Sequence, residues 1–332
     1  MRSDITLKIA VVGCGKIGER HIMAYKGIGG VEIVACDLNE ELAKEVASKY
    51  GVGWARDYRE ALENEEFTAI DVCTPTFMHY DVVMDGLEHE LHVFCEKPLA
   101  ESVEKIRRIY EKALEVDRIV MVGYLYRHYP AMKFVKKVLD EGVLGRPYYA
   151  IFRLGGRGGH RVWKHRKETC GGTIFEMMTH MIDLALWFFG DIKEAKLLHE
   201  NVILKKRLIE GRIVDVDAED VAVALFKTKG DVEVLCESDL ITPSYNNIIE
   251  IQADNGSIFS SILHYIPTIL YLKENRGIYN RGPNFYNFPR INVFERELKY
   301  FIDCIRSGKR KVLNGVDDSI KIARVIETLK ES

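Results

Sequence analysis

The sequence carries no large excess of charge of either sign. Its 47 lysines and arginines and its 50 aspartates and glutamates leave a formal net charge of −3. Such a chain has no summed field to hold a polyphosphate backbone or an acidic lipid surface, so we expect neither nucleic acid nor membrane partners. Long hydrophobic runs are also missing, since the apolar run Ile9 to Gly13 is far too short for a signal peptide or a membrane span. We therefore expect a cytoplasmic protein.

Clustered cysteines are absent as well. The seven cysteines stand singly, and no two form a C-x-x-C pair. An odd, unclustered set argues against a disulfide framework and against a structural zinc site. We expect most of them to be small buried hydrophobic residues without a chemical role. They are Cys14, Cys36, Cys73, Cys95, Cys170, Cys236 and Cys304.

The length and the apolar content are sufficient for two domains. The chain has 332 residues, of which 47% are hydrophobic and 29% charged. In residues 1–123, short apolar runs alternate with helical segments, which predicts β-α units and a doubly wound parallel sheet, an α/β Rossmann domain. The predicted strands are Lys8–Val12, Glu32–Cys36, Ala69–Cys73, His92–Cys95 and Ile119–Val122; the predicted helices are Ile17–Ile28, Glu40–Tyr50, Tyr58–Leu62, Met78–Glu88 and Val103–Glu115.

The pattern changes in residues 124–332, which we assign to a second, α+β domain. Strand-like runs there follow one another without intervening helices, which predicts a large, open, mostly antiparallel sheet. The runs include Val221–Lys227, Val232–Ser238 and Ile248–Ala253, and the predicted helices are Ala131–Asp140, Thr173–Phe189, Val293–Arg306 and Asp317–Leu329. No internal repeat or proline-rich linker separates the two domains.

A dinucleotide-binding motif follows the first predicted strand. Gly13-Cys14-Gly15-Lys16-Ile17-Gly18 matches G-x-G-x-x-G and leads into a helix. The first two glycines allow a tight turn and close approach of a pyrophosphate to the helix N-terminus, and the third allows close helix packing. We predict cofactor contacts from Gly13, Gly15, Lys16, Ile17 and Gly18.

An acidic residue stands where such a motif requires it. Asp37 ends the second predicted strand, 19 residues after Gly18 (37 − 18 = 19). A carboxylate at this place accepts hydrogen bonds from the adenosine ribose hydroxyls and repels a 2′-phosphate. NAD is therefore the expected cofactor in preference to NADP. The alternative is a surface aspartate that caps the helix starting near Glu40.

Three further segments complete a pattern. They are Cys73-Thr74-Pro75-Thr76 with His79, then Glu96-Lys97-Pro98-Leu99-Ala100, then Gly171-Gly172-Thr173-Ile174-Phe175-Glu176 with His180 and Asp183. In this order, over nearly the whole chain, they resemble the glucose-fructose oxidoreductase and inositol dehydrogenase (Gfo/Idh/MocA) family of NAD(P)-dependent sugar and cyclitol dehydrogenases. The resemblance implies a Rossmann domain joined to an α+β domain whose open sheet forms an oligomer interface.

The resemblance also implies roles for single residues. Lys97 occupies the family's catalytic lysine position, Pro98 the proline that often follows a cis bond, and His180 the proton-transferring histidine. Cofactor contacts are implied for Thr74, Pro75, His79, Glu96, Lys97 and Arg127. The family usually has Asp where this chain has Glu176, which leaves the reaction class plausible and the substrate open.

The residues support the catalytic assignments independently. Lys97 directly follows a strand end, so it should point into the crevice where Rossmann ligands bind and polarise a hydroxyl. Glu176, His180 and Asp183 have the spacing of one helix face. A neutral histidine there can accept a proton while a carboxylate orients it. We name Lys97, His180 and Glu176 as catalytic candidates, whereas Asp183 suits packing or orientation.

Several alternatives stay open at this point. Arg127 and Tyr124 could belong to an interdomain contact, and the loop Gly155–Arg161 could bind a substrate phosphate or carboxylate or be a solvated loop tip. Glu176-x-x-x-His180 has helical metal-ligand spacing, but Lys97 supplies the electrophilic assistance a metal would give, so we expect no metal.

The expected function is reversible oxidation of a secondary alcohol of a sugar, cyclitol or nucleotide sugar with NAD. The alternatives are a family member acting on a non-sugar, such as a dihydrodiol or a tetrapyrrole, and a non-catalytic NAD-binding regulator. Apolar residues on both faces of Val221–Lys227 further predict a homodimer or homotetramer, unless the aromatic stretch Tyr279–Phe288 covers the second face.

Overall fold

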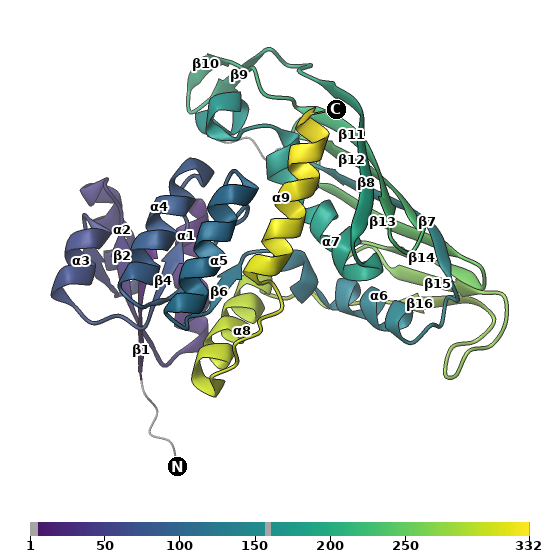
Figure 1. Cartoon of the computed structure of the whole chain (residues 1–332), viewed down its shortest axis with the longest axis horizontal. Coiled ribbons are helices and arrows are strands. Elements are labelled where there is room, and N and C mark those ends of the chain that lie inside the picture. Colours follow the sequence, from purple (N-terminus) through teal and green to yellow (C-terminus); the bar gives the residue numbers. More distant parts are fainter. Residues whose placement is uncertain (1–5, 157–160, 332) are drawn as a thin grey trace. The chain divides into compact units, whose positions relative to one another are not determined.

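The chain forms two compact units, which are described separately below. The computed structural model describes residues 6–156 and 161–331 (Figure 1). The first unit contains Met1–Leu125 and Asn292–Ile320, and the second contains Tyr126–Ile291 and Lys321–Ser332. The expected division into 1–123 and 124–332 therefore needs a correction, because residues 292–320 return to the first unit. The cause is the apolar face of their helix, whose Leu298 and Phe301 join the same core as Ile22 and Tyr25.

The first unit is built on a six-stranded parallel sheet. Its order is β3-β2-β1-β4-β5-β6, the doubly wound arrangement in which the strand order reverses beside β1. The strands are β1 (Leu7–Val12), β2 (Val31–Cys36), β3 (Gly53–Ala55), β4 (Ala69–Val72), β5 (His92–Cys95) and β6 (Val120–Val122). Sequence reasoning missed the short edge strand β3, because its three residues form no apolar run.

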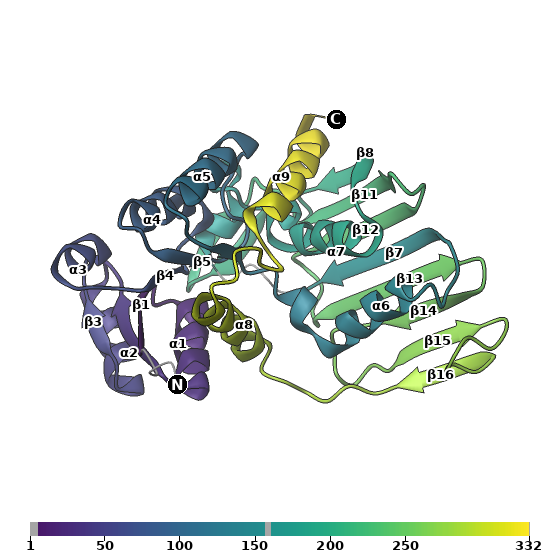
Figure 2. The same cartoon turned by 60° about the horizontal axis from the view of Figure 1, so that its bottom comes forward.

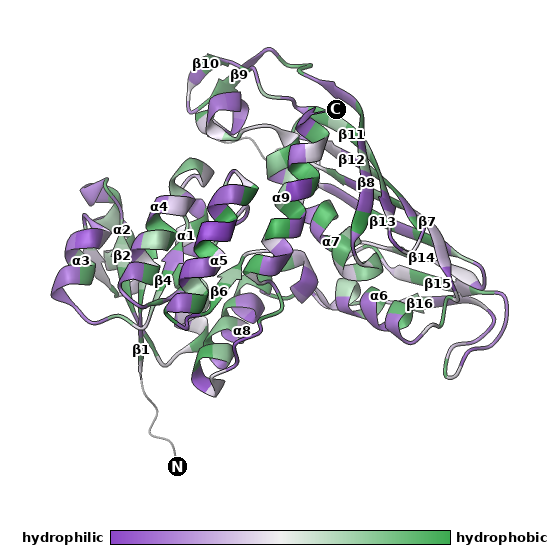
Figure 3. Ribbon diagram, in the orientation of Figure 1, coloured by the Kyte–Doolittle hydropathy of each residue, from purple (hydrophilic) through white to green (hydrophobic). Residues whose placement is uncertain are grey.

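Six helices belong wholly to this unit. They are α1 (Lys16–Ile28), α2 (Glu40–Tyr50), α3 (Tyr58–Asn64), α4 (Thr76–Glu88), α5 (Val103–Glu115) and α8 (Val293–Ser307). Several begin at a side chain that accepts a hydrogen bond from the first turn, for example Asn39 at α2 and Ser102 at α5. In Figure 3, α5 carries many hydrophilic residues, as expected of a helix with one solvent face.

The second unit is built on an eight-stranded sheet of order β16-β15-β14-β13-β7-β12-β11-β8. Only the β12–β7 pair is parallel among its pairings, so the predicted mostly antiparallel sheet is confirmed. The strands are β7 (Pro147–Gly155), β8 (Ile192–Asn201), β11 (Val221–Thr228), β12 (Glu233–Asp239), β13 (Asn246–Ala253), β14 (Gly256–Ser260), β15 (Thr268–Leu272) and β16 (Gly282–Tyr286), while β9 (Lys206–Ile209) and β10 (Arg212–Asp215) form a separate pair.

Helices α6 (Pro130–Asp140) and α7 (Thr179–Phe189) cover one face of this sheet (Figure 2). The predicted helix Thr173–Phe189 is interrupted at its start, because Ile174–Met178 forms a π-helical turn before α7. The N–H of Thr179 bonds to the carbonyl of Ile174, five residues back. Helical periodicity alone does not distinguish a π turn from an α turn, so the sequence could not show this.

The opposite face of the sheet is partly exposed and apolar in places. In β11, Ala222, Ala224 and Phe226 are buried, whereas the alternating Val223 and Leu225 are half-buried. The aromatic stretch does not cover this second face. Its Tyr279, Tyr286 and Phe288 gather around Phe134 of α6, with ring centroids 4.4–6.4 Å away, and α6 lies on the other side.

The C-terminal helix α9 (Val316–Glu331) begins in the first unit and continues in the second. In its second part, Lys321 pairs with Asp191, and the ammonium of Lys330 lies 4.2 Å from the ring centroid of Phe175. None of the described helices is long and apolar enough to cross a membrane.

Candidate active site

The glycine motif forms a tightly fitted turn between β1 and α1. A Cβ atom at Gly18 would lie 1.8 Å from the carbonyl oxygen of Gly13, and one at Gly13, whose φ is +96°, would lie 2.8 Å from the carbonyl oxygen of Cys73. Gly15 differs, because no described atom lies within 4 Å of its added Cβ. The first and third glycines therefore close the turn, and the second faces open space at the start of a helix.

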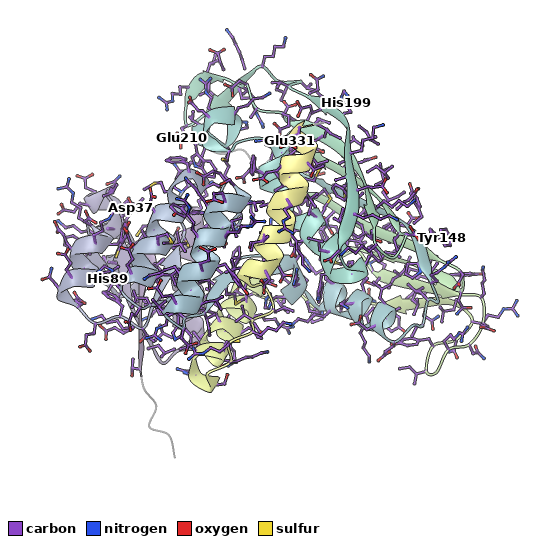
Figure 4. All side chains as sticks on the ribbon, viewed as in Figure 1. Asp37, His89, Tyr148, His199, Glu210 and Glu331 are labelled. Carbon is purple, nitrogen blue, oxygen red and sulfur yellow. The ribbon has the colours of Figure 1, made fainter. Side chains whose placement is uncertain are left out.

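Asp37 holds its carboxylate beside this turn (Figure 4). Oδ2 accepts the backbone N–H of Cys14 at 2.8 Å, and Oδ1 accepts that of Asn39 at 2.9 Å. The cap of α2 is Asn39 instead, whose side chain accepts the N–H of Leu42. An open glycine backbone at a helix N-terminus, with a fixed carboxylate next to it, fits the pyrophosphate and ribose of a dinucleotide. The residues present therefore fit NAD.

His79 ties together two loops at the ends of neighbouring strands. Its Nε2 lies 2.8 Å from the carbonyl oxygen of Thr74, after β4, and its Nδ1 lies 2.7 Å from that of Pro98, after β5. Burial lowers the pKa of His79, although the two carbonyls oppose that shift. The His79 side chain is buried and both ring nitrogens contact these carbonyls, and its expected cofactor contact stays a prediction. It supports the loops that carry Thr74, Pro75 and Lys97.

Glu96 and Lys97 follow β5, and the Lys97–Pro98 peptide is cis, as the resemblance implied. The Glu96 carboxylate accepts the Lys97 N–H at 3.3 Å and lies 3.3 Å from Nε2 of His21. The other ring nitrogen of His21 contacts Asp71 at 2.9 Å. Burial lowers the pKa of His21, but the charges of Asp71 and Cys73 and their hydrogen bonds to the ring together raise the pKa well above its usual range. His21 therefore braces the strand end that carries Lys97, through its contacts with Asp71 and Glu96.

This brace was not anticipated from the sequence. His21, Asp71 and Cys73 bring three potential metal-ligating atoms within 4.8 Å of one another in the described part of the chain. Their separations are hydrogen-bond distances, with the Cys73 sulfur 3.2 Å from Nδ1 of His21 and 3.4 Å from Asp71. A hydrogen-bonded histidine explains the cluster, and the absence of a metal stays a prediction. Burial raises the pKa of the Cys73 thiol, which suits its expected inert role.

In the second unit, His180 lies in the first turn of α7 and is buried. The ring of Tyr126 stacks on it at 4.5 Å between centroids, with 12° between the planes. The Tyr126 hydroxyl in turn bonds to the hydroxyl of Tyr245, which follows β12. The stacked tyrosine fixes the plane of the imidazole. Sequence reasoning did not single out Tyr126 or Tyr245, since nothing in the spacing of 126, 180 and 245 brings them together.

Glu176 lies in the π-helical turn and is 5% exposed. Its Oε2 is 2.5 Å from Nζ of Lys164, which belongs to the 3-10 helix Val162–His165. The Lys164 side chain keeps 24% of its surface exposed. The carboxylate predicted as catalytic is therefore half of an ion pair. Nothing in the spacing of residues 164 and 176 indicated that Lys164 is the partner of Glu176.

Arg127 and Asp183 form a second ion pair in the same unit, and both are buried. Nη2 of Arg127 lies 2.6 Å from Oδ1 of Asp183, and Nε donates to Oδ2 at 3.2 Å. The Arg127 guanidinium also lies 5.8 Å from the ring centroid of Trp187. Asp183 therefore balances the charge of Arg127, and the expected cofactor contact of Arg127 stays a prediction. The packing role expected of Asp183 agrees with this geometry.

The loop Gly155–Arg161 lies partly outside the described residues. Where it resumes, Arg161 pairs with Glu210 at 2.6 Å (Glu210 is labelled in Figure 4), and Arg166 lies 3.7 Å from Asp217. Each of these cations thus has a carboxylate partner. The alternative of an anion-binding loop loses support from the described part.

Comparison with known proteins agrees with this architecture. A family model described as "Oxidoreductase family, NAD-binding Rossmann fold" matches residues 7–124, and the model of the GFO/IDH/MocA C-terminal domain matches residues 132–259. The chain belongs to the Gfo/Idh/MocA family of oxidoreductases. The family assignment covers both units, so the glycine turn belongs to an NAD-binding Rossmann domain.

Relatives in the Gfo/Idh/MocA family match nearly the whole chain. Myo-inositol 2-dehydrogenase of Thermotoga maritima is 27% identical, over 95% of this chain and 93% of the relative. The scyllo-inositol 2-dehydrogenase (NAD(+)) of Bacillus subtilis is 29% identical, over 95% and 91%. The solved structure of levoglucosan dehydrogenase with NADH and levoglucosan has a TM-score of 0.88 at 20% identity, covering 98% of this chain and 96% of that one. That likeness shows the same fold.

Proposed function

We propose that the chain is an NAD-dependent dehydrogenase that oxidises a secondary alcohol of a sugar, a cyclitol or a nucleotide-linked sugar. Relatives named as inositol 2-dehydrogenases match it over 95% of its length. The observation that carries the proposal is the combination of this match with a lysine at a Rossmann strand end and a buried histidine–carboxylate wall on α7 and its π turn.

The first unit binds the cofactor in this proposal. The open backbone of Gly15 admits the pyrophosphate, and Asp37 accepts the ribose hydroxyls and repels the 2′-phosphate of NADP. Thr74 and Pro75 line the same end of the sheet, since they follow β4 directly. Bound NAD supplies the acceptor for the hydride that leaves the substrate carbon.

Side chains of the protein accept the proton of the substrate hydroxyl and stabilise the negative charge that develops on its oxygen. His180 accepts the hydroxyl proton, because a histidine near neutrality can serve as a base. Lys97 donates to the same oxygen and stabilises the negative charge that develops on it. Tyr126 holds the imidazole plane by stacking, and Glu176 accepts a hydrogen bond from a substrate hydroxyl.

The sheet of the second unit supports a homodimer or homotetramer. Val223 and Leu225 leave apolar surface on the face opposite α6 and α7, and the aromatic stretch packs on α6 instead. A second copy of the chain would cover that face. Light scattering at micromolar concentration tests this, because a particle of 38.1 kDa would be a monomer and would contradict it.

Cofactor-linked turnover tests the proposed function directly. The purified chain is assayed for reduction of NAD, and separately of NADP, with free sugars, inositols and nucleotide sugars. We expect turnover of one of these classes, with NAD preferred. Tighter binding of NADP would contradict the role of Asp37, and reduction of NAD by none of the compounds would contradict the function itself.

A further inference from the structure

The segment that carries Lys164 has a fixed backbone. The backbone carbonyls of four consecutive residues, 163–166, each accept a hydrogen bond. The carbonyl of Trp163 accepts from the Thr169 hydroxyl at 2.7 Å, and the carbonyl of Lys164 accepts from the Gly172 N–H at 2.9 Å. The carbonyl of His165 accepts from the Ala218 N–H at 3.2 Å, and the carbonyl of Arg166 accepts from the Gly171 N–H at 2.9 Å. The position of the Lys164 backbone is therefore set by the fold.

The motif glycines bring this segment against the start of the π-helical turn. A Cβ atom at Gly171 would lie 2.6 Å from the carbonyl carbon of Lys164 and 2.7 Å from the nitrogen of Arg166. Gly172 has φ of +103°, and a Cβ there would lie 2.3 Å from the carboxylate of Glu219. Only glycine allows such an approach. The glycines next to Glu176 thus place Lys164 within reach of its carboxylate.

The pair has one half-buried and one buried member. Glu176 is 5% exposed, whereas the Lys164 side chain is 24% exposed, and their charged atoms are 2.5 Å apart. A buried carboxylate needs a compensating charge, which Lys164 supplies. The ammonium has three N–H donors and uses one of them on Glu176. It is therefore equipped to donate to a ligand oxygen as well.

We propose that Lys164 is a substrate-binding residue, and that Glu176 and Lys164 act as one acceptor–donor pair that recognises two neighbouring hydroxyl oxygens of an uncharged polyol. The inference rests on the proposed function and names its substrate class. Glu176 accepts the proton of one hydroxyl, and Lys164 donates to the oxygen on the adjacent carbon.

Charge balance favours an uncharged polyol over a phosphorylated or acidic sugar. The Lys164–Glu176 pair is neutral as a unit, and the neighbouring Arg161 and Arg166 are paired with Glu210 and Asp217. An anionic group would add a negative charge that no described cation of this cluster compensates, because each already has a carboxylate partner. Two vicinal hydroxyls can use the acceptor and the donor together, without breaking a pair. The family usually has aspartate at the position of Glu176. The longer glutamate side chain reaches Lys164 and so allows the neutral pair to form.

The test combines variants of the enzyme with substrates that lack single hydroxyls. The wild-type chain is assayed with NAD and myo-inositol, D-glucose or levoglucosan, and then with the monodeoxy analogues of the best of these. We expect two adjacent hydroxyls whose removal each lowers kcat/KM by about 10-fold or more, the usual cost of losing a hydrogen bond to a charged group.

The variants assign those two hydroxyls. Lys164→Met should raise KM about 10-fold while changing kcat less. It should also abolish the deoxy penalty, the loss of kcat/KM on removing a hydroxyl, for one of the two hydroxyls. Glu176→Asp should reduce the penalty for the other. Lys167→Met is the matched control, since Lys167 lies on the same segment outside the ion pair, and it should keep both penalties. An unchanged NADH dissociation constant and melting temperature show that a variant is folded.

The outcomes separate this inference from the proposed function. If Lys164→Met keeps both deoxy penalties, the role of Lys164 is wrong while the dehydrogenase assignment stands. If the wild type prefers the phosphate ester of the polyol and Lys164→Met loses that preference, Lys164 binds an anionic group. The inference that the substrate is an uncharged polyol is then wrong. Reduction of NAD with nucleotide sugars but with no free polyol contradicts the polyol class, and reduction with none of these compounds contradicts the proposed function itself. Should Lys164→Met fail to fold, Glu176→Asp with both penalties intact overturns the pair.

Discussion

The two units position their candidate site residues by different means. In the first unit the backbone makes the site: three glycines shape the turn, and Asp37 binds it through the backbone N–H of Cys14. In the second unit side chains make it, through Glu176 with Lys164, His180 with Tyr126, and the buried ion pair of Arg127 with Asp183. A site made by backbone is fixed by local sequence, whereas a site made by side chains depends on partners far apart in the chain.

The largest expected effect comes from removing a catalytic candidate, which should slow the reaction without weakening cofactor binding. His180→Ala and Lys97→Ala should each lower kcat by about 10²–10⁴-fold, the usual contribution of a proton-transferring group, and leave the NADH dissociation constant nearly unchanged. The losses should be non-additive, since both groups act on one alcohol. Steady-state kinetics and NADH fluorescence titration measure the two quantities. Full activity in either single variant would show that the catalytic residues are misassigned.

The next effect tests the buried charges of the second unit. Arg127→Met leaves the fully buried Asp183 without its guanidinium partner and should lower the free energy of unfolding by about 3–5 kcal/mol. Urea denaturation measures it. The matched control is Arg276→Met, which removes an exposed arginine paired with Glu274 and should leave stability near wild type. Equal stability of both variants would mean that the buried pair does not support this unit.

A smaller effect tests the backbone-built half. Gly15→Ala adds a methyl group where no described atom lies within 4 Å, at an ordinary φ of −68°, so the melting temperature should stay unchanged. NADH affinity should fall by about 10-fold or more, because the pyrophosphate needs that space. Gly18→Ala should lower both quantities, since its Cβ would meet the Gly13 carbonyl at 1.8 Å. Wild-type NADH affinity in Gly15→Ala would place the cofactor elsewhere.

The smallest expected effect is a difference between the two units in how their stability changes with pH. In the first unit, burial lowers the pKa of His92 to about 4 and also lowers that of His79. These neutral rings contribute stability above about pH 6.5, and that contribution is lost as the pH falls toward 4. In the second unit, burial raises the pKa of Glu219, so its neutralisation regains stability as the pH falls through that raised pKa.

Between pH 6 and 4.5 the first unit should therefore lose about 1 kcal/mol relative to the second. Hydrogen exchange corrected for its intrinsic pH dependence resolves the two units. His92→Gln should reduce the acid loss of the first unit only. Equal acid responses of the two units, in the wild type and in this variant, would mean that the neutral histidines and Glu219 do not distinguish them.

The same contrast explains what the sequence could predict. The parallel sheet and the glycine turn depend on residues close together in sequence, so local patterns indicated them, whereas the cis peptide before Pro98 was implied by the family resemblance. The mostly antiparallel sheet of the second domain was also predictable from its strand runs. Edge strand β3 was missed because Gly53–Ala55 has no apolar pattern, and segment 292–320 was misplaced because its partner helix α1 lies far back in the chain.

Side-chain partnerships mark where sequence reasoning stops. Helical spacing placed Glu176, His180 and Asp183 on one face, yet their partners Lys164, Tyr126 and Arg127 come from other segments. The π-helical turn also shifts Glu176 relative to an α-helix. The sequence shows where a carboxylate stands, but it does not show which cation pairs with that carboxylate. This pairing sets the net charge of the site and therefore which substrates the carboxylate can bind.

The transfer of a labelled hydrogen tests the central claim most directly. The chain is incubated with NAD and a polyol that it oxidises, deuterated at the reacting carbon, and the NADH formed is analysed by mass spectrometry. The proposed function predicts NADH one mass unit heavier than the unlabelled compound, with formation reduced by about 10²–10⁴-fold in His180→Ala. NADH without the label, or labelled NADH formed as fast in His180→Ala as in the wild type, would contradict it.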